Sequence, residues 1–189
     1  MKKNFNEHER VLHMQMVLHI VEYIITVYDC IFIERVVILY VVKFAKDKSE
    51  IIRQYVCKLL QVISQFVSYE THCNTFRQVY TQMCIDDSTT VRNEAVMILP
   101  QLMKDNVAKS HTNTNTTNIN TTNINSYYII QYINFTFDRD ESIQLTTINI
   151  YSAFITQLTP NEIDPKYCDV FKNLIDIHFY NNKQNDNNE

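Results

Sequence analysis

The 189-residue sequence contains no glycine. Phosphate-binding loops, dinucleotide-binding turns and the nucleophile elbow of hydrolases all need glycine, because their backbone must approach a phosphate closely or turn sharply. The sequence also has no excess of positive charge: its formal net charge is −4 and its isoelectric point is about 5.9. The electrostatic surface that nucleic acid requires is therefore not expected.

Targeting and membrane-spanning segments are not expected either. The first ten residues, MKKNFNEHER, are polar and contain no apolar core of a signal peptide. The most apolar stretch, IVEYIITVYDCIFIERVVILYVV, is interrupted by Glu22, Asp29, Glu34 and Arg35, which disfavours a membrane span. Five cysteines follow no pattern and lie mostly among apolar residues, as reduced thiols do. We expect a cytoplasmic or nuclear protein that does not enter a membrane.

A repeat of 39 residues runs through the first half of the chain. DKSEIIRQYVCKLLQVI begins at Asp47 and DDSTTVRNEAVMILPQL begins at Asp86, so that Arg53 aligns with Arg92. A third copy, DRDESIQLTTINIYSAF, begins 52 residues after the second and has Gln144 in place of the arginine. The apolar positions of the first two copies also coincide.

The extra length before the third copy falls in SHTNTNTTNINTTNIN, which is rich in Asn and Thr and has no apolar periodicity. Such a segment cannot bury enough apolar surface to offset the entropy of ordering, so we predict a disordered loop. The chain then divides into helical repeats at 5–109, this insert at 110–125, a further repeat with a terminal helix at 126–180, and a disordered tail at 181–189.

Each copy is predicted to form a helical hairpin. Asp47, Asp86 and Asp138 are placed to cap the second helix, and a Glu three residues after the first and third matches the capping box. Apolar residues recur behind the cap at helical spacing. The high content of β-branched residues favours strands as the competing interpretation, but runs of 12 or more residues with caps favour helices. Pro100 should kink or end its helix near Leu99.

The motif Asp-x4-Val/Ile-Arg, followed by a small residue three positions on, resembles the HEAT repeat in a hairpin of about 40 residues. VRNEAVMILPQL and FAKDKSEIIRQYVCKLL are similar to the scaffold subunit of type 2A serine/threonine phosphatases and to regulatory subunit 1 of protein phosphatase 4. The resemblance covers roughly Phe32 to Met103 and, more weakly, Tyr127 to Leu158. It implies an all-α, right-handed solenoid of three to four hairpins. It also implies a non-catalytic subunit that holds a phosphatase catalytic subunit; a HEAT-repeat adaptor of the karyopherin or vesicle-coat class is the alternative.

In this family the turns inside successive hairpins align along one ridge that contacts other subunits. The residues that match these turns, and are therefore candidates for binding a partner protein, are Asp47, Lys48, Ser49, Asp86, Asp87, Ser88, Arg139 and Asp140. The aspartates and arginines also resemble a structural ladder of caps and ion pairs between neighbouring repeats. The residues assigned to that ladder are Asp47, Arg53, Asp86, Arg92 and Asp138.

Catalytic and metal-binding patterns are not found. Three N-terminal histidines stand five and six residues apart, so they do not share one helix face, and His72 and Cys73 precede Cys84 by a spacing that matches no zinc site. No Ser, Cys or Lys has an identifiable base partner. We therefore expect no enzyme, no metal and no cofactor.

Residues 5–28 are predicted to form the second helix of an earlier repeat that lacks the Asp and the Arg. This helix is apolar on several sides; its apolar residues are Val11, Leu12, Met14, Val17, Leu18, Ile20 and Val21. An apolar outer side indicates an end that another subunit covers, or a piece of a longer array.

Overall fold

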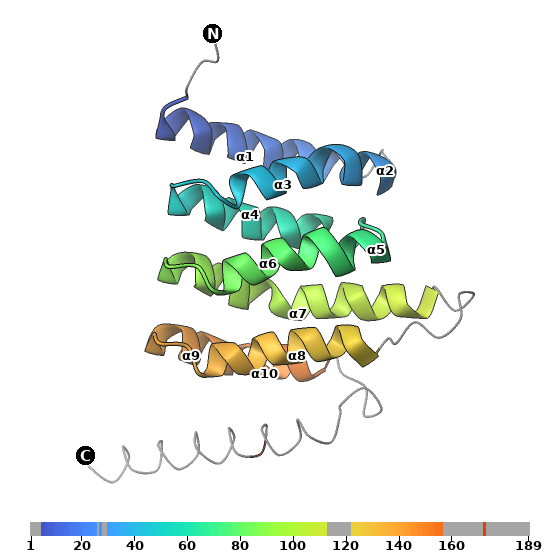
Figure 1. Ribbon diagram of the computed structural model, residues 1–189, viewed down its shortest axis with the longest axis vertical. Coiled ribbons are helices and arrows are strands. Elements are labelled where there is room, and N and C mark those ends of the chain that lie inside the picture. The colour runs from blue at the N-terminus through green and yellow to red at the C-terminus, as the bar shows by residue number, and fades with distance from the viewer. Residues whose placement is uncertain (1–4, 26, 28–29, 113–121, 157–171, 173–189) are drawn as a thin grey trace.

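A computed structural model describes residues 5–25, 27, 30–112, 122–156 and 172, and every regular element in these residues is a helix (Figure 1). Most of the elements are α-helices. They are α1 (Glu7–Ile24), α2 (Cys30–Phe32), α3 (Ile38–Phe44), α4 (Glu50–Ile63), α5 (Tyr69–Thr71), α6 (Arg77–Cys84), α7 (Thr89–Thr112), α8 (Thr122–Thr136), α9 (Glu141–Asn149) and α10 (Tyr151–Ile155). The all-α prediction is confirmed.

Two further elements are single turns of π-helix, η1 (Ile33–Val37) and η2 (His72–Phe76). Each continues directly into an α-helix, η1 into α3 and η2 into α6. The two π-turns begin 39 residues apart, which is the period of the sequence repeat. The repeat is therefore a repeat of local backbone geometry as well as of sequence.

The helices stack along the long axis of the molecule in chain order (Figure 1). Consecutive helices pack as pairs, α3 with α4, α6 with α7 and α8 with α9. The second helices of these pairs also pack on one another in sequence, so that α1, α4, α7 and α9 form one continuous row. Each pair thus presents its connecting turn at the same edge of the stack.

One apolar core runs through the stack, because every helix turns an apolar face toward its neighbours. In α4 the buried residues are Ile52, Val56, Cys57, Leu59, Leu60 and Ile63, which recur at helical spacing. The ring of Tyr80 is fully buried, and its hydroxyl donates to the backbone carbonyl of Ala95 at 2.9 Å. This hydrogen bond satisfies a polar group that burial would otherwise leave unpaired.

The ends of the predicted loop at 110–125 differ from the expectation. Helix α7 continues to Thr112 and α8 begins at Thr122, so both ends of this segment are helical backbone. Residues 113–121 lie outside the described residues, as do most of the predicted terminal helix and the tail at 181–189. Pro100 lies inside α7 and does not end it. Within the part of the chain that the structure describes, none of the helices combines the length and hydropathy that a membrane crossing requires.

Candidate protein interface at the turns

The predicted role of the aspartates as helix caps is wrong. Each aspartate lies three residues before its helix begins, and its carboxylate accepts the backbone N–H two residues further on. The three distances, from Asp47 to Ser49, from Asp86 to Ser88 and from Asp138 to Asp140, are all 2.9 Å. This is an Asx turn, in which the carboxylate shapes the turn and leaves the first helical turn to other groups. The residue at the cap position is Ser49 in α4 and Asp140 in α9.

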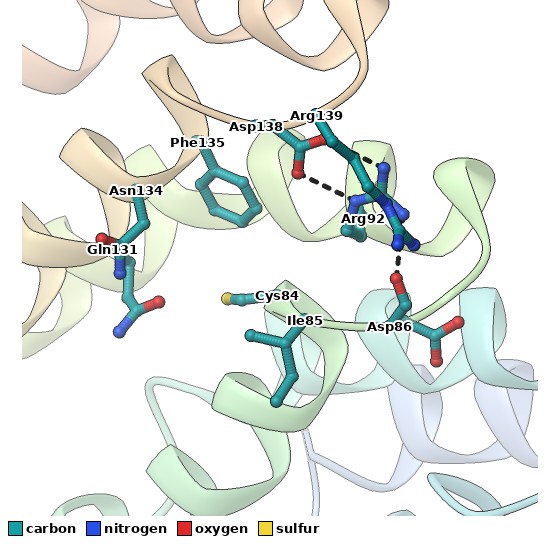
Figure 2. A pocket seen from close by; sticks show the side chains of 9 residues that line it. All are labelled: Cys84, Ile85, Asp86, Arg92, Gln131, Asn134, Phe135, Asp138 and Arg139. Carbon is teal, nitrogen blue, oxygen red and sulfur yellow. Dashed lines mark hydrogen bonds and ion pairs between the residues drawn. The ribbon is translucent and has the colours of Figure 1, made fainter.

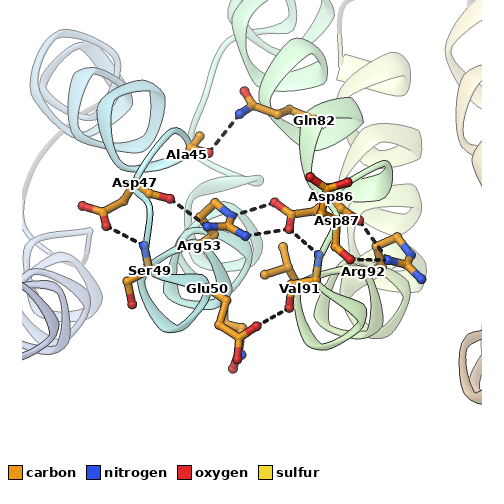
Figure 3. A network of polar contacts seen from close by, with 12 residues as sticks. Ala45, Asp47, Ser49, Glu50, Arg53, Gln82, Asp86, Asp87, Val91 and Arg92 are labelled. Carbon is orange, nitrogen blue, oxygen red and sulfur yellow. Dashed lines mark hydrogen bonds and ion pairs between the residues drawn. The ribbon is translucent and has the colours of Figure 1, made fainter. Parts of the chain in front are cut away.

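The same carboxylates connect neighbouring pairs of helices. Arg53 donates to both oxygens of Asp86, at 2.7 and 2.8 Å (Figure 3). Arg92 donates to both oxygens of Asp138, at 2.9 Å each. The guanidinium fork matches the carboxylate in this bidentate geometry, which fixes direction as well as distance. Each arginine thus holds the turn of the next pair in a set position relative to its own.

Each arginine also holds its own turn. Its remaining nitrogen, Nη1, donates to the carbonyl of the aspartate six residues earlier, at 2.8 Å from Arg53 to Asp47 and 2.9 Å from Arg92 to Asp86. Gln144 stands at the equivalent position of α9, and its amide makes the corresponding bond to the carbonyl of Asp138 at 2.7 Å. The replacement of Arg by Gln therefore keeps the bond within the repeat and lacks the ion-pairing group.

Helix α1 also contributes an arginine, contrary to the prediction. Arg10 donates to both carboxylate oxygens of Asp47, at 3.1 and 3.2 Å, and stands fourth in its helix as Arg53 does in α4. A capping box is present at the start of α1, where Asn6 and Glu9 exchange side-chain to backbone hydrogen bonds at 2.9 Å. We refer to the three pairs Arg10–Asp47, Arg53–Asp86 and Arg92–Asp138 as the arginine ladder.

The electrostatics of the ladder follow from this geometry. Burial opposes the ionisation of Asp86, but hydrogen bonds from Arg53 and from the N–H of Ser88, together with the nearby arginine charges, lower its pKa below the usual 3.8. The hydrogen bond with Asp86 raises the pKa of Arg53, and the bond with Asp138 raises that of Arg92. Asp86 and Arg53 are thus both ionised at neutral pH.

Three of the eight candidate binding residues are exposed at this edge: Lys48, Asp87 and Arg139. Arg139 donates to the carbonyl of Asp87 at 3.1 Å, so two of them are brought together. Ser49 is buried and therefore not available to a partner. The remaining four are engaged within the fold: Asp47 and Asp86 in the ladder, Ser88 with Glu50 at 2.6 Å, and Asp140 with Thr89 at 2.8 Å.

Two exposed apolar residues at the same edge were missed by sequence reasoning. Ile85 and Phe137 each precede a ladder aspartate directly, and their exposed fractions are 74% and 65%. The equivalent position in the first turn holds Lys46, which is exposed as well. Aligning the turns as AKDKS, CIDDS and TFDRD would have revealed them, because Ile85 and Phe137 then stand as apolar residues in otherwise polar turns.

Ile85 separates two hollows between successive turns. One, of about 320 Å³, lies between the second and third turns and is lined by Ile85, Phe135, Gln131 and Arg139 among others (Figure 2). The other, of about 560 Å³, lies between the first and second turns and includes Lys46 and Lys48. The edge therefore combines apolar surface with exposed charges. These charges are basic in the first turn (Lys46 and Lys48), acidic in the second (Asp87) and basic in the third (Arg139).

The described residues contain no group of three or more His, Cys, Asp or Glu side chains that could hold a metal ion. Burial raises the pKa of the Cys57 and Cys84 thiols, which disfavours the thiolate that a nucleophile requires. His72 is buried, stacks on Phe76 and bonds through Nε2 to the hydroxyl of Tyr128 at 2.9 Å. These groups are part of the core.

No protein-family model matches the chain, and neither a curated protein nor a solved structure shows significant similarity to it.

Proposed function

We propose that the chain is a right-handed α-solenoid of HEAT-like hairpins that acts as a non-catalytic scaffold in the cytoplasm or nucleus. It binds a partner protein along the edge formed by the turns. The partner class that the sequence resemblance implies is a serine/threonine phosphatase catalytic subunit.

One observation supports the proposal most directly. The arginine ladder fixes three successive turns, while other side chains of the same turns remain exposed to solvent. A ladder of bidentate pairs makes the edge rigid, so a partner that docks there does not have to order it first. The side chains of Lys48, Ile85 and Phe137 make no hydrogen bond or ion pair in the described residues and are not needed to hold the turns. Exposed apolar residues beside exposed charged residues are typical of the centre and rim of a protein interface.

The test is direct binding of the purified chain to purified phosphatase catalytic subunits of the type 2A and type 4 classes, measured by biolayer interferometry. The double variant Ile85→Asp, Phe137→Asp should weaken binding at least tenfold, because each removes an apolar anchor worth more than about 1 kcal/mol. Met97→Asp provides the matched control: Met97 is exposed to a similar degree but lies in the middle of α7, away from the turns.

Charge reversal of Lys48→Glu with Asp87→Lys tests the polar part of the edge, and folding is checked by circular dichroism. Loss of binding in the edge variants with the control intact supports the proposal. Equal binding by all variants would place the interface elsewhere. If the catalytic subunits fail to bind, while a transport GTPase or a coat subunit binds through the same edge, the phosphatase assignment is wrong and the adaptor alternative holds.

A further inference from the structure

The first of the three turns carries a local excess of positive charge. Lys43, Lys46 and Lys48 lie at this turn or just before it, and all three are exposed. None of their side chains forms an ion pair in the residues that the structure describes. The whole chain has a formal net charge of −4, so these lysines oppose the charge of the protein. We call the three residues the lysine cluster.

The carboxylates around the lysine cluster already have partners within the fold. Asp47 and Asp86 each accept two hydrogen bonds from an arginine of the ladder. The carboxylate of Asp87 lies 3.9 Å from the guanidinium of Arg139. Glu50, at the start of α4, accepts a hydroxyl of the second turn at 2.6 Å. Among the described residues, the lysine cluster is thus the charge of the first turn that lacks a counter-ion.

The cluster borders a hollow that also has an apolar side. Lys46 and Lys48 line the hollow of about 560 Å³ between the first and second turns, and Ile85 lines it from the second turn. Gln82 also lines this hollow, and its amide nitrogen donates to the carbonyl of Ala45 at 2.9 Å (Figure 3). A group that enters the hollow therefore meets two ammonium groups and an exposed apolar side chain.

This combination favours a carboxylate next to an apolar side chain. Complementary charges across an interface speed the encounter and select against partners of the wrong sign. A phosphate group carries nearly two negative charges, whereas a carboxylate carries one. The hollow is also lined by the carboxylates of Asp47, Asp86 and Asp87, which repel a dianion more strongly than a monoanion. The lining therefore suits a single negative charge.

We propose that this hollow takes an Asp or Glu side chain of the partner protein, with a neighbouring apolar side chain of the partner resting on Ile85. This inference rests on the proposed function for the location of the partner, and it adds the chemistry of the segment that the partner presents. The order of the turns gives the segment a direction. Its acidic end lies on the first turn, and its apolar end lies on the second and third turns, where Phe137 is exposed.

The experiment selects peptides from a phage-displayed library of random linear sequences on the immobilised 189-residue chain. The selected peptides should be enriched in Asp or Glu near apolar residues. With a fluorescent label, they should bind at least about tenfold more weakly to Lys46→Glu, Lys48→Glu, because two attractive charges become repulsive. The matched control is Arg35→Glu, Lys104→Glu, which changes the net charge equally at exposed positions away from the turns and should bind as the parent does. Selection without acidic enrichment, or equal binding by both variants, would overturn the proposal.

An exchange of charges provides a second measurement and shows whether the lysine variant is folded. Replacing the acidic residue of a selected peptide by Lys should abolish binding to the parent chain and restore it to Lys46→Glu, Lys48→Glu. Absence of this rescue, with helical circular dichroism unchanged, would contradict the assigned contact. A peptide with phosphoserine at the acidic position should bind more weakly than the acidic peptide; tighter binding would assign the hollow to a phosphate and overturn the carboxylate.

Failure of this assignment can be distinguished from failure of the proposed function. If the phosphatase catalytic subunits do not bind while acidic peptides bind through the lysine cluster, the partner class is wrong and the acidic contact stands. If a catalytic subunit binds the parent chain and Lys46→Glu, Lys48→Glu equally well, the scaffold function stands and the acidic contact is wrong.

Discussion

The substitution Arg53→Gln tests one ion pair of the arginine ladder, Arg53–Asp86. The third copy of the repeat already has glutamine at the equivalent position, Gln144. Glutamine at that position still bonds to the carbonyl of the aspartate six residues earlier, as Gln144 does at 2.7 Å. The variant should therefore keep the bond from position 53 to Asp47 and lose only the bidentate pair with Asp86. The carboxylate of Asp86 would retain the N–H of Ser88 at 2.9 Å.

The expected loss of stability follows from how deeply the Arg53–Asp86 pair is buried. The side chains of Arg53 and Asp86 are 15% and 7% exposed, so the pair lies close to the buried limit. Removing one partner of a buried pair costs about 3–5 kcal/mol, and exposed pairs contribute about 0–1 kcal/mol. Because one hydrogen bond to Asp86 survives, we expect a loss of about 2–3 kcal/mol in the free energy of unfolding.

The assay is urea denaturation followed by far-ultraviolet circular dichroism, with Arg35→Gln as the control. Arg35 is exposed, and its replacement should change stability by no more than about 0.5 kcal/mol. The double variant Arg53→Gln, Asp86→Asn should recover part of the loss, because an uncharged amide replaces the buried carboxylate. A loss of about 0.5 kcal/mol or less for Arg53→Gln would refute the reasoning and indicate a solvent-screened pair.

The pH dependence of the free energy of unfolding provides an independent check on the Arg53–Asp86 pair. The pKa of Asp86 is lower in the folded protein than in the unfolded chain, so its contribution is complete above about pH 3.9 and is lost as the pH falls through the depressed folded value. The stability difference between the parent and Arg53→Gln should therefore shrink below about pH 4. A difference that stays constant down to strongly acidic pH would contradict the assigned pairing.

Two further predictions concern the core. Burial and raised pKa values should make Cys57 and Cys84 unreactive toward a thiol reagent in the folded protein, with Cys73 labelled first of these three; peptide mapping by mass spectrometry would refute this if all three reacted together. Leu59→Ala should cost about 2–5 kcal/mol in urea denaturation because it leaves a cavity, whereas Leu145→Ala, at an exposed position, should cost far less; equal losses would contradict the assigned burial.

The helices and their repetition were accessible from the sequence. Apolar spacing within each copy and the 39-residue period predicted where α4, α7 and α9 lie, because a helix must turn one face toward its neighbours. The lack of glycine also argued against glycine-dependent phosphate-binding loops and a nucleophile elbow on composition alone.

The functions of individual polar residues were less predictable. Asp-x-Ser before a helix is compatible with an N-cap at the Asp or with an Asx turn that ends at the Ser. Local sequence does not separate the two, since both satisfy a backbone N–H with the same carboxylate. The structure separates them through the arginine of the preceding repeat, which needs the Asp86 carboxylate turned toward Arg53.

The position of Arg10 in the arginine ladder and the exposure of Ile85 to solvent both depend on how the repeats stack. Arg10 has no aspartate six residues earlier, so its place in the ladder appears only when α1 packs beside the turn that contains Asp47. Ile85 is apolar and adjoins a helix, as core residues do, and only the packing of neighbouring turns leaves it in solvent. Local periodicity decides which residues form a helix, but the partner of a charge and the cover of an apolar side chain come from segments distant in sequence, and only the tertiary arrangement brings them together.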